Sequence, residues 1–168
     1  MQHAGRAISI LLFVVFTTLQ GCYSFQGVLP EYIKTVAIPV FDDTSGAGIG
    51  QYRHLLTKGI IDKIDGQSSL RFTPSRALAD AVIEGTIISY SDFPAQLSSV
   101  TERAISNRIT LVVHVTMADR VKKSLIFDQS FVGFADYTQN DTVGQQAAIQ
   151  YAISQIVDAI FDRAVSGW

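Results

Sequence analysis

The sequence predicts an α+β fold, a two-layer sandwich in which two helices pack on one face of a four-stranded mixed sheet. Two segments carry apolar residues at helical spacing, and four others are apolar and β-branched in the manner of strands. They follow one another in the order β-α-β-β-β-α, with room for one extra short strand. Because an amphipathic helix must bury its apolar face, both helices are expected to cover the same face of a mainly antiparallel sheet. The 168 residues, 48% of them hydrophobic, suffice for one domain.

The first expected strand covers residues 34–41 (KTVAIPVF). Pro39 cannot donate to a strand ladder, so it places this strand at a sheet edge or marks a bulge. Residues 42–48 have turn chemistry, and a helix is expected over 49–64, ended by Asp65-Gly66. The apolar face of this helix consists of Tyr52, Leu55, Leu56, Ile60 and Ile64.

The middle of the chain predicts three longer strands. A short strand at 70–73 is possible before the strand at 81–90, and residues 91–104, which contain Pro94, are expected to form a loop. The strands at 105–118 and 125–137 are joined by a charged turn. In the first of these two, apolar side chains alternate from Ile109 to Met117, while the Thr and His side predicts a more polar second sheet face. In the second, one side should carry Leu125, Phe127 and Phe131.

The last helix has the clearest pattern. Thr142 and Gln145 are a candidate capping box at its start, and Gly167 is expected to end it. Its apolar residues repeat at intervals of three and four: Ile149, Ala152, Ile153, Ile156, Val157, Ile160, Phe161 and Ala164.

Residues 1–21 are predicted to be the signal peptide of a bacterial lipoprotein. Arg6 precedes an apolar stretch at 8–19, which is too short to span a bilayer core of roughly 30 Å. The following segment, LQGC, resembles a lipobox, in which the cysteine thiol takes a diacylglycerol and the freed amine is usually acylated, for instance with palmitate. Cys22 is the single cysteine of the sequence, so no internal disulfide can form. The alternatives are a plain signal peptide with a free thiol, or an uncleaved anchor.

Residues 22–33 are then a lipidated tether, and residues 34–168 form a single domain. Two or more acyl chains anchor a protein stably, since each buried CH₂ contributes about 0.8 kcal/mol. Tyr23 follows the cysteine, where enterobacterial lipoproteins retained at the inner membrane carry Asp. The expected location is therefore the periplasmic face of the outer membrane.

Candidate chemistry is sparse. Gly46, Gly48 and Gly50 lack the spacing of a phosphate loop and follow two Asp residues, so a flexible turn is favoured over phosphate binding. Neither His54 nor His114 has metal-ligand spacing around it, and no nucleophile elbow is present. We therefore expect no enzyme, no metal and no cofactor beyond the lipid. The net charge of −2 argues against nucleic acid as a partner.

Three basic residues, Arg120, Lys122 and Lys123, crowd the turn between the last two strands. Such a turn is either a solvated turn or a site for an anionic partner. The candidate partners are lipid phosphate, a glycolipid head group and an acidic protein surface. The sequence leaves these readings open.

Several segments together resemble the lipopolysaccharide-assembly lipoprotein family LptE. In order along the chain these segments are GCYSF at 21–25, LP at 29–30, IKTVAIPVF at 33–41, EGTI at 84–87 and SGW at 166–168. The resemblance covers nearly the whole mature chain and implies two helices on a four-stranded sheet. It also implies that the protein helps to assemble and plugs a large outer-membrane β-barrel, LptD, and contacts lipopolysaccharide.

The family's lipopolysaccharide-contacting basic residues cannot be matched to this sequence one by one, so none is carried over. A second hypothesis is another periplasmic lipoprotein with a similar small domain, either a peptidoglycan-synthase activator or a secretion-pore component. Segments such as IPVF and EGTI would suit that hypothesis as well.

Overall fold

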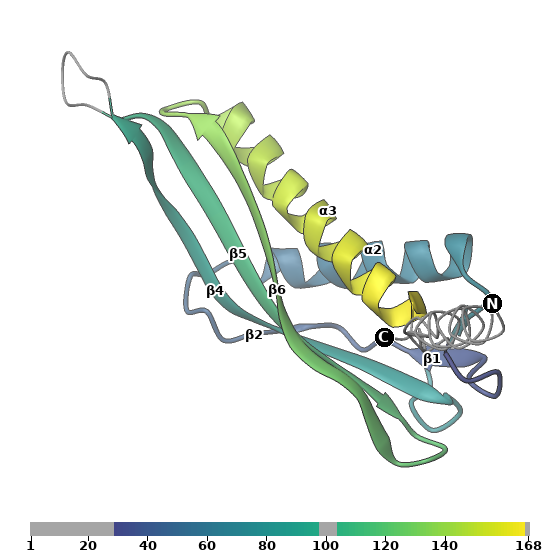
Figure 1. The fold of residues 1–168 in the computed structure, drawn as a ribbon. Coiled ribbons are helices and arrows are strands. Elements are labelled where there is room, and N and C mark those ends of the chain that lie inside the picture. Colours follow the sequence, from purple (N-terminus) through teal and green to yellow (C-terminus); the bar gives the residue numbers. More distant parts are fainter. Residues whose placement is uncertain (1–28, 98–103, 167–168) are drawn as a thin grey trace, which may run out of the picture.

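The structure of the protein is a computed structural model, which describes residues 29–97 and 104–166. The predicted signal peptide (1–21) and Cys22 lie outside the described residues. Figure 1 shows an elongated, twisted sheet with helices on one side. The elements follow as β1 (Thr35–Ala37), β2 (Asp42–Asp43), α2 (Gln51–Gln67), β3 (Arg71–Phe72), β4 (Ala81–Leu97), β5 (Ala104–Asp119), β6 (Ser124–Thr138) and α3 (Thr142–Ser166).

Within the described ranges, one mixed sheet contains six strands in the order β3-β1-β4-β5-β6, with β2 pairing β4 beside this path. Strand β1 runs parallel to β3 and β4, β2 runs parallel to β4, and β4, β5 and β6 are antiparallel. The predictions of an α+β fold, two helices and a mixed sheet are confirmed. The four-stranded sheet and the order β-α-β-β-β-α are wrong, because the expected first strand is split in two and the short strand β3 joins the sheet.

The split of the first strand occurs around Pro39, which lies between β1 and β2. Here the chain bends into the core, so that Phe41 is fully buried and its backbone N–H donates to Thr57 Oγ1 over 3.0 Å. A Cβ on Gly85 would lie 2.2 Å from the Phe41 ring. Glycine is therefore required opposite this aromatic side chain, and the IPVF and EGTI segments meet in the core.

Strand β4 is longer than expected, and the predicted loop at 91–104 is wrong over residues 91–97. Pro94 pairs with Asn107 of β5, while β2 reaches along the other edge of β4 only as far as Ile87. Past that point the described residues place no strand on this edge. A proline is tolerated on such an edge, because its missing N–H costs no ladder hydrogen bond.

The alternation along β5 is confirmed, since the side chains from Ile109 to Met117 at every second position are buried. The placement of Leu125 beside Phe127 and Phe131 is wrong. Met117 pairs with Phe127 but its neighbour Ala118 pairs with Leu125, which leaves one extra residue in β6. This bulge turns Leu125 to the exposed side of the sheet.

Both helices bury most of the residues expected. All eight apolar residues predicted for α3 are buried, and α2 differs only in that Leu55 is exposed and Thr57 is buried. The capping box is wrong: Asp141 caps α3 by accepting the N–H of Gly144 over 2.9 Å. Helix α3 lies so close to β6 that a Cβ on Gly133 would be 2.1 Å from the carbonyl oxygen of Ala152.

Candidate functional site

The described chain begins at the end of the sheet where β5 turns into β6. Tyr32 and Ile33, predicted as part of the tether, pack against the hydrophobic core, and Ile33 is buried. The N–H of Ile33 donates to the carbonyl oxygen of Pro30 over 2.9 Å, which forms a turn ahead of β1. The last part of the predicted tether is therefore attached to the domain.

A contact between Tyr32 and the β5–β6 turn fixes this arrangement. The Tyr32 hydroxyl donates to the carboxylate of Asp119, and Lys122 Nζ lies 4.8 Å from the centre of the Tyr32 ring. Burial tends to raise the pKa of Asp119, but hydrogen bonds from Tyr32 and from the Lys122 backbone N–H outweigh it and lower the pKa. The carboxylate of Asp119 is thus held ionised inside the domain.

A second carboxylate at this end is also used internally. Asp80 Oδ2 accepts the backbone N–H groups of Lys34 and Thr35 over 3.0 and 2.9 Å and the Thr35 hydroxyl over 2.8 Å. The N–H of Lys34 is the main cause of the lowered pKa of Asp80. The carbonyl oxygen of Asp80 accepts the N–H of Arg120 over 2.8 Å, which joins the 75–80 loop to the β5–β6 turn.

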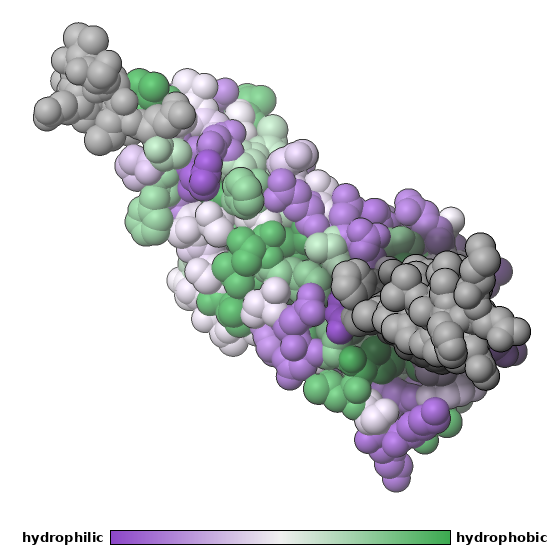
Figure 2. Space-filling model, viewed as in Figure 1, coloured by the Kyte–Doolittle hydropathy of each residue, from purple (hydrophilic) through white to green (hydrophobic). Residues whose placement is uncertain are grey.

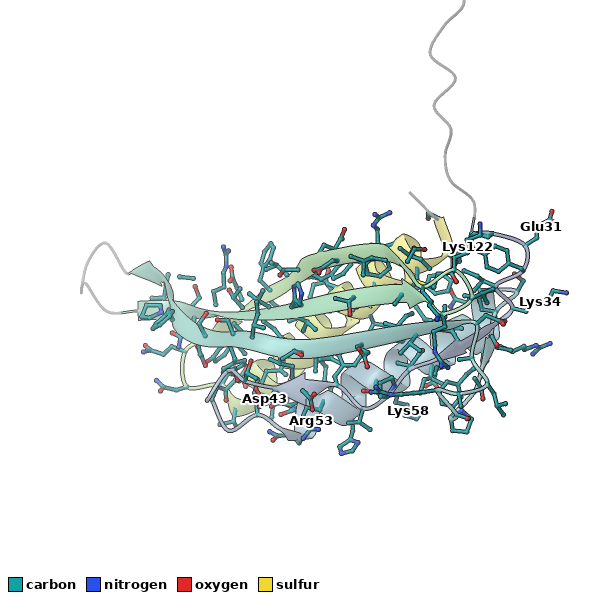
Figure 3. All side chains as sticks on the ribbon, turned by 90° about the horizontal axis from the view of Figure 1, so that it is seen from below. Glu31, Lys34, Asp43, Arg53, Lys58 and Lys122 are labelled. Carbon is teal, nitrogen blue, oxygen red and sulfur yellow. The ribbon has the colours of Figure 1, made fainter. Side chains whose placement is uncertain are left out.

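Five exposed cations gather here, and we call this surface the basic end; it consists of Lys34, Arg71, Arg120, Lys122 and Lys123. Lys34 and Arg71 are neighbours because the Arg71 N–H donates to the Lys34 carbonyl oxygen over 2.8 Å. Figure 3 shows Lys34 and Lys122 at the same end of the molecule, together with the exposed carboxylate of Glu31. Within the described part of the chain, none of the five forms an ion pair.

The structure therefore adds to the predicted site. It brings Arg120, Lys122 and Lys123 together on one turn, as the sequence implied, and Lys123 adopts a left-handed conformation with φ 54°. Lys34 and Arg71 were missed, because strand pairing between β1 and β3 brings them to the turn from distant parts of the chain. No local pattern in the sequence indicated that neighbourhood.

The sheet face away from the helices is here called the outer face. It is polar in the half nearer the β5–β6 turn. His114 Nε2 lies 3.0 Å from Asp128 Oδ1, and His114 Nδ1 lies 3.3 Å from Ser130 Oγ. These side chains are directly opposite or diagonal across β5 and β6 and are partly exposed, as cross-strand polar pairs commonly are. The strand register accounts for this grouping without a catalytic role.

The other half of the outer face is apolar, contrary to the expectation of a polar face. Phe93 is 68% exposed on β4, and Val132 and Phe134 are exposed on β6. Figure 2 shows hydrophobic residues over the middle of β6. Arg108 pairs with Asp136 through two hydrogen bonds of 2.7 and 2.9 Å and lies 5.1 Å from the Phe134 ring centre.

The end of β4, β5 and β6 opposite the basic end is here called the far end. On its helix side lies a polar cluster that the sequence did not indicate. Asp92 accepts hydrogen bonds from Asn107 Nδ2 (3.0 Å), the Tyr137 hydroxyl (2.6 Å) and Gln145 Nε2 (2.8 Å). Burial tends to raise the pKa of Asp92, but these donors lower it overall. Gln145 is in the first turns of α3, so the cluster ties the start of α3 to the sheet.

The remaining sequence candidates are accounted for locally. Gly46 and Gly48 both have φ 70°, as a tight turn requires, and Asp43 Oδ1 accepts the N–H and hydroxyl of Ser45 over 2.9 and 2.6 Å. His54 is exposed on α2. In the residues with described placement, no group of three or more His, Cys, Asp or Glu could hold a metal. Over the same residues, neither helix has the length and hydropathy needed to cross a membrane.

The chain is similar to known proteins in its sequence family and in its fold. The model of a lipopolysaccharide-assembly family, LptE, matches residues 33–164. Among curated proteins, none matches the sequence significantly.

Solved structures with similar folds include a Xanthomonas campestris protein at 9% identity and TM-score 0.60, covering 84% of this chain and 91% of that one. The rare lipoprotein B of Shewanella oneidensis matches at 11% identity and TM-score 0.57, covering 79% and 95%. An uncharacterized lipoprotein B of Nitrosomonas europaea matches at 13% identity and TM-score 0.53, covering 86% and 89%. At these identities the structures establish similarity of fold alone.

Proposed function

The chain belongs to the lipopolysaccharide-assembly family LptE, and from this premise we propose that it is a lipoprotein subunit assisting lipopolysaccharide export and assembly at the outer membrane. In this role it acts as the assembly partner and plug of a large outer-membrane β-barrel similar to LptD. The single observation that carries the proposal is the family match, which begins at Ile33 beside the basic end and ends at Ala164 in α3.

The anchor is part of the proposal. Residues 1–21 are the signal peptide, and mature Cys22 carries a diacylglycerol and an N-acyl chain that hold the domain at the periplasmic face of the outer membrane. Support comes from the lipobox at residues 19–22. A Cys22→Ala variant should lose incorporation of labelled palmitate and most of its flotation with membranes. Retention of both properties would refute the anchor.

We propose a binding and assembly role without catalysis. The polar clusters of the described domain support this role, since Asp80, Asp92 and Asp119 all bond to groups of the chain itself. An anion-binding surface lies at the end where the N-terminal segment joins the domain, and it is supplied by Arg120, Lys122 and Lys123. Lipid phosphate, glycolipid head groups and acidic protein surfaces share the chemistry that such a surface accepts.

The test is purification of the tagged protein from outer membranes after mild crosslinking. We expect a large β-barrel to co-purify, and depletion of the protein to lower the amount of newly made lipopolysaccharide at the cell surface. Cys22→Ala is the matched control, since it leaves the folded domain intact and removes the anchor. Recovery of peptidoglycan synthases or a secretion pore in place of a β-barrel would reverse the assignment in favour of a different periplasmic lipoprotein.

A further inference from the structure

Two exposed apolar side chains stand among the cations of the basic end. Leu78 is 76% exposed on the 75–80 loop, and Val121, between Arg120 and Lys122, is 59% exposed on the β5–β6 turn. The two loops are adjacent, because the Arg120 N–H donates to the carbonyl oxygen of Asp80 over 2.8 Å. The carbonyl oxygen of Leu78 in turn accepts the Thr35 hydroxyl over 3.4 Å.

A single exposed apolar residue is ordinary on a protein surface. Two neighbouring ones surrounded by five cations form a different kind of surface. Ammonium and guanidinium groups bind lipid phosphates at the level of the head groups, while apolar side chains reach the acyl boundary beneath them. This combination matches the layered chemistry of an anionic membrane surface better than that of a free phosphate.

The charge balance at this end favours an anionic partner. Asp80 and Asp119 are engaged by hydrogen bonds from Lys34, Thr35 and Tyr32, so these carboxylates face the protein. Glu31 is exposed among the cations and offsets part of their charge. Asp65, which accepts the N–H of Phe72 beside Arg71 over 2.9 Å, is a fourth carboxylate at this end. Among the described residues, the five cations still exceed these four carboxylates.

The distance to the anchor also limits where this surface can be. Six residues lie between Cys22 and Leu29, the first described residue, and even a fully extended chain covers these seven steps with at most about 25 Å. Tyr32 then fixes the chain to the β5–β6 turn through Asp119 and Lys122. A lipid on Cys22 would therefore keep the basic end close to the bilayer surface.

We infer that the basic end, together with Leu78 and Val121, docks on the anionic phospholipid surface of the membrane that holds the anchor. This inference rests on the proposed lipidation of Cys22. Docking gives the anchored domain a defined orientation, with the basic end on the lipid head groups at the periplasmic face of the membrane. The lipid supplies attachment, and the basic end determines orientation.

The experiment places an environment-sensitive fluorophore on Val121→Cys in the lipidated mature chain. Cys22 is the single native cysteine, so its acylated form leaves the introduced thiol alone for labelling. The protein is reconstituted in phosphatidylcholine vesicles with or without about 30% phosphatidylglycerol. On anionic vesicles we expect emission to shift to shorter wavelength and quenching by aqueous iodide to be lost. The same label on Val143→Cys, 79% exposed at the start of α3, should stay quenched on both.

Charge variants decide whether the cations are responsible. Arg120→Gln with Lys123→Gln leaves the Tyr32–Lys122 contact in place and should abolish the shift at position 121. Lys58→Gln with Arg108→Gln removes the same charge elsewhere and should leave the shift unchanged. Equal quenching at position 121 on neutral and anionic vesicles would overturn the inference. Protection seen only when lipopolysaccharide replaces phosphatidylglycerol would also overturn it, in favour of a glycolipid site.

Failure of the anchor is distinguishable from failure of docking. If the protein takes up no palmitate, the proposed anchor is refuted. Docking is then judged on the labelled chain carrying Cys22→Ser, mixed with the same vesicles, because the label reports the surroundings of position 121 and not the anchor. Protection on anionic vesicles would support docking, and its absence would refute it.

Discussion

The basic end and the far end of strands β4, β5 and β6 present opposite surfaces. At the basic end, cations that form no ion pair within the described residues surround the exposed apolar side chains of Leu78 and Val121. At the far end, the described residues of an exposed apolar strip, which include Phe93 and Phe134, contain one cation, Arg108, and it is already paired with Asp136. One end is suited to an anionic surface whose attraction weakens with salt, and the other to an apolar partner whose binding does not.

The difference also concerns how each end is held together. At the basic end, Asp80 and Asp119 join the incoming chain to two loops. At the far end, Asp92 joins β4, β5, β6 and α3 in one cluster. Each end therefore depends on its own carboxylates, while the packing of α3 on β6 connects them.

The largest effect is expected from Gly133→Ala, which tests that connection. The new Cβ would lie 2.1 Å from the Ala152 carbonyl oxygen, a backbone atom that cannot rotate away. We expect a loss of about 2–3 kcal/mol in the free energy of unfolding, measured in urea, with both ends destabilised together. Gly66→Ala is the control, since open space surrounds that position; it should stabilise α2 by about 0.5–1 kcal/mol. Equal stability of the two variants would contradict the close packing.

A smaller, local effect is expected from Asp92→Ala. The change removes the acceptor for Asn107, Tyr137 and Gln145 and leaves their donors partly buried, for a loss of about 1–3 kcal/mol. Hydrogen exchange should accelerate in the first turns of α3 and in residues 134–138, and remain unchanged around Asp119. Uniform acceleration along the chain would show that the two ends are not independent.

Acid should loosen both ends. The pKa values of Asp80, Asp92 and Asp119 lie below the ordinary value of 3.8 in the folded protein. The unfolded chain therefore binds more protons as the pH falls through that value, so stability present at neutral pH is lost on acidification. In Asp92→Ala the acid-induced loss should be smaller. What remains should come from the basic end and from Asp136, whose pKa is lowered by hydrogen bonds from Arg108. Urea unfolding between pH 6 and pH 3 (about the range in which carboxyls titrate) measures this difference. An unchanged loss in Asp92→Ala would contradict the far-end contribution.

The smallest effect is expected from Tyr32→Phe. The ring and its contact with Lys122 remain, and only the hydrogen bond to Asp119 is lost. Global stability should change little, whereas hydrogen exchange at Ile33 and in the β5–β6 turn should accelerate. Tyr151→Phe, an exposed change on α3, is the matched control and should leave exchange at both sites unaltered. No acceleration at Ile33 in Tyr32→Phe would mean that core packing alone fixes the incoming chain.

Local pattern predicted much of this fold. The two helices were evident because their apolar residues repeat at helical spacing, and the buried side of β5 because its side chains alternate. The loop expected at 91–104 was wrong because a proline disrupts a strand only where its missing N–H would have to pair with a neighbouring strand. The sequence does not show that this edge of β4 is open at Pro94. Leu125 was misplaced because a bulge arises from the pairing of two strands, which neither strand reveals alone.

By itself the sequence determined the fold class, the apolar faces, the lipobox hypothesis at Cys22 and the clustering of Arg120, Lys122 and Lys123, because each depends on residues close together in the chain. The tertiary structure decided the six-stranded order, the requirement for Gly85 beneath Phe41 and for Gly133 beneath α3, and the placing of Lys34 and Arg71 beside the basic turn. Those features depend on contacts between residues far apart in sequence, which become neighbours only once the strands have paired and the helices have packed.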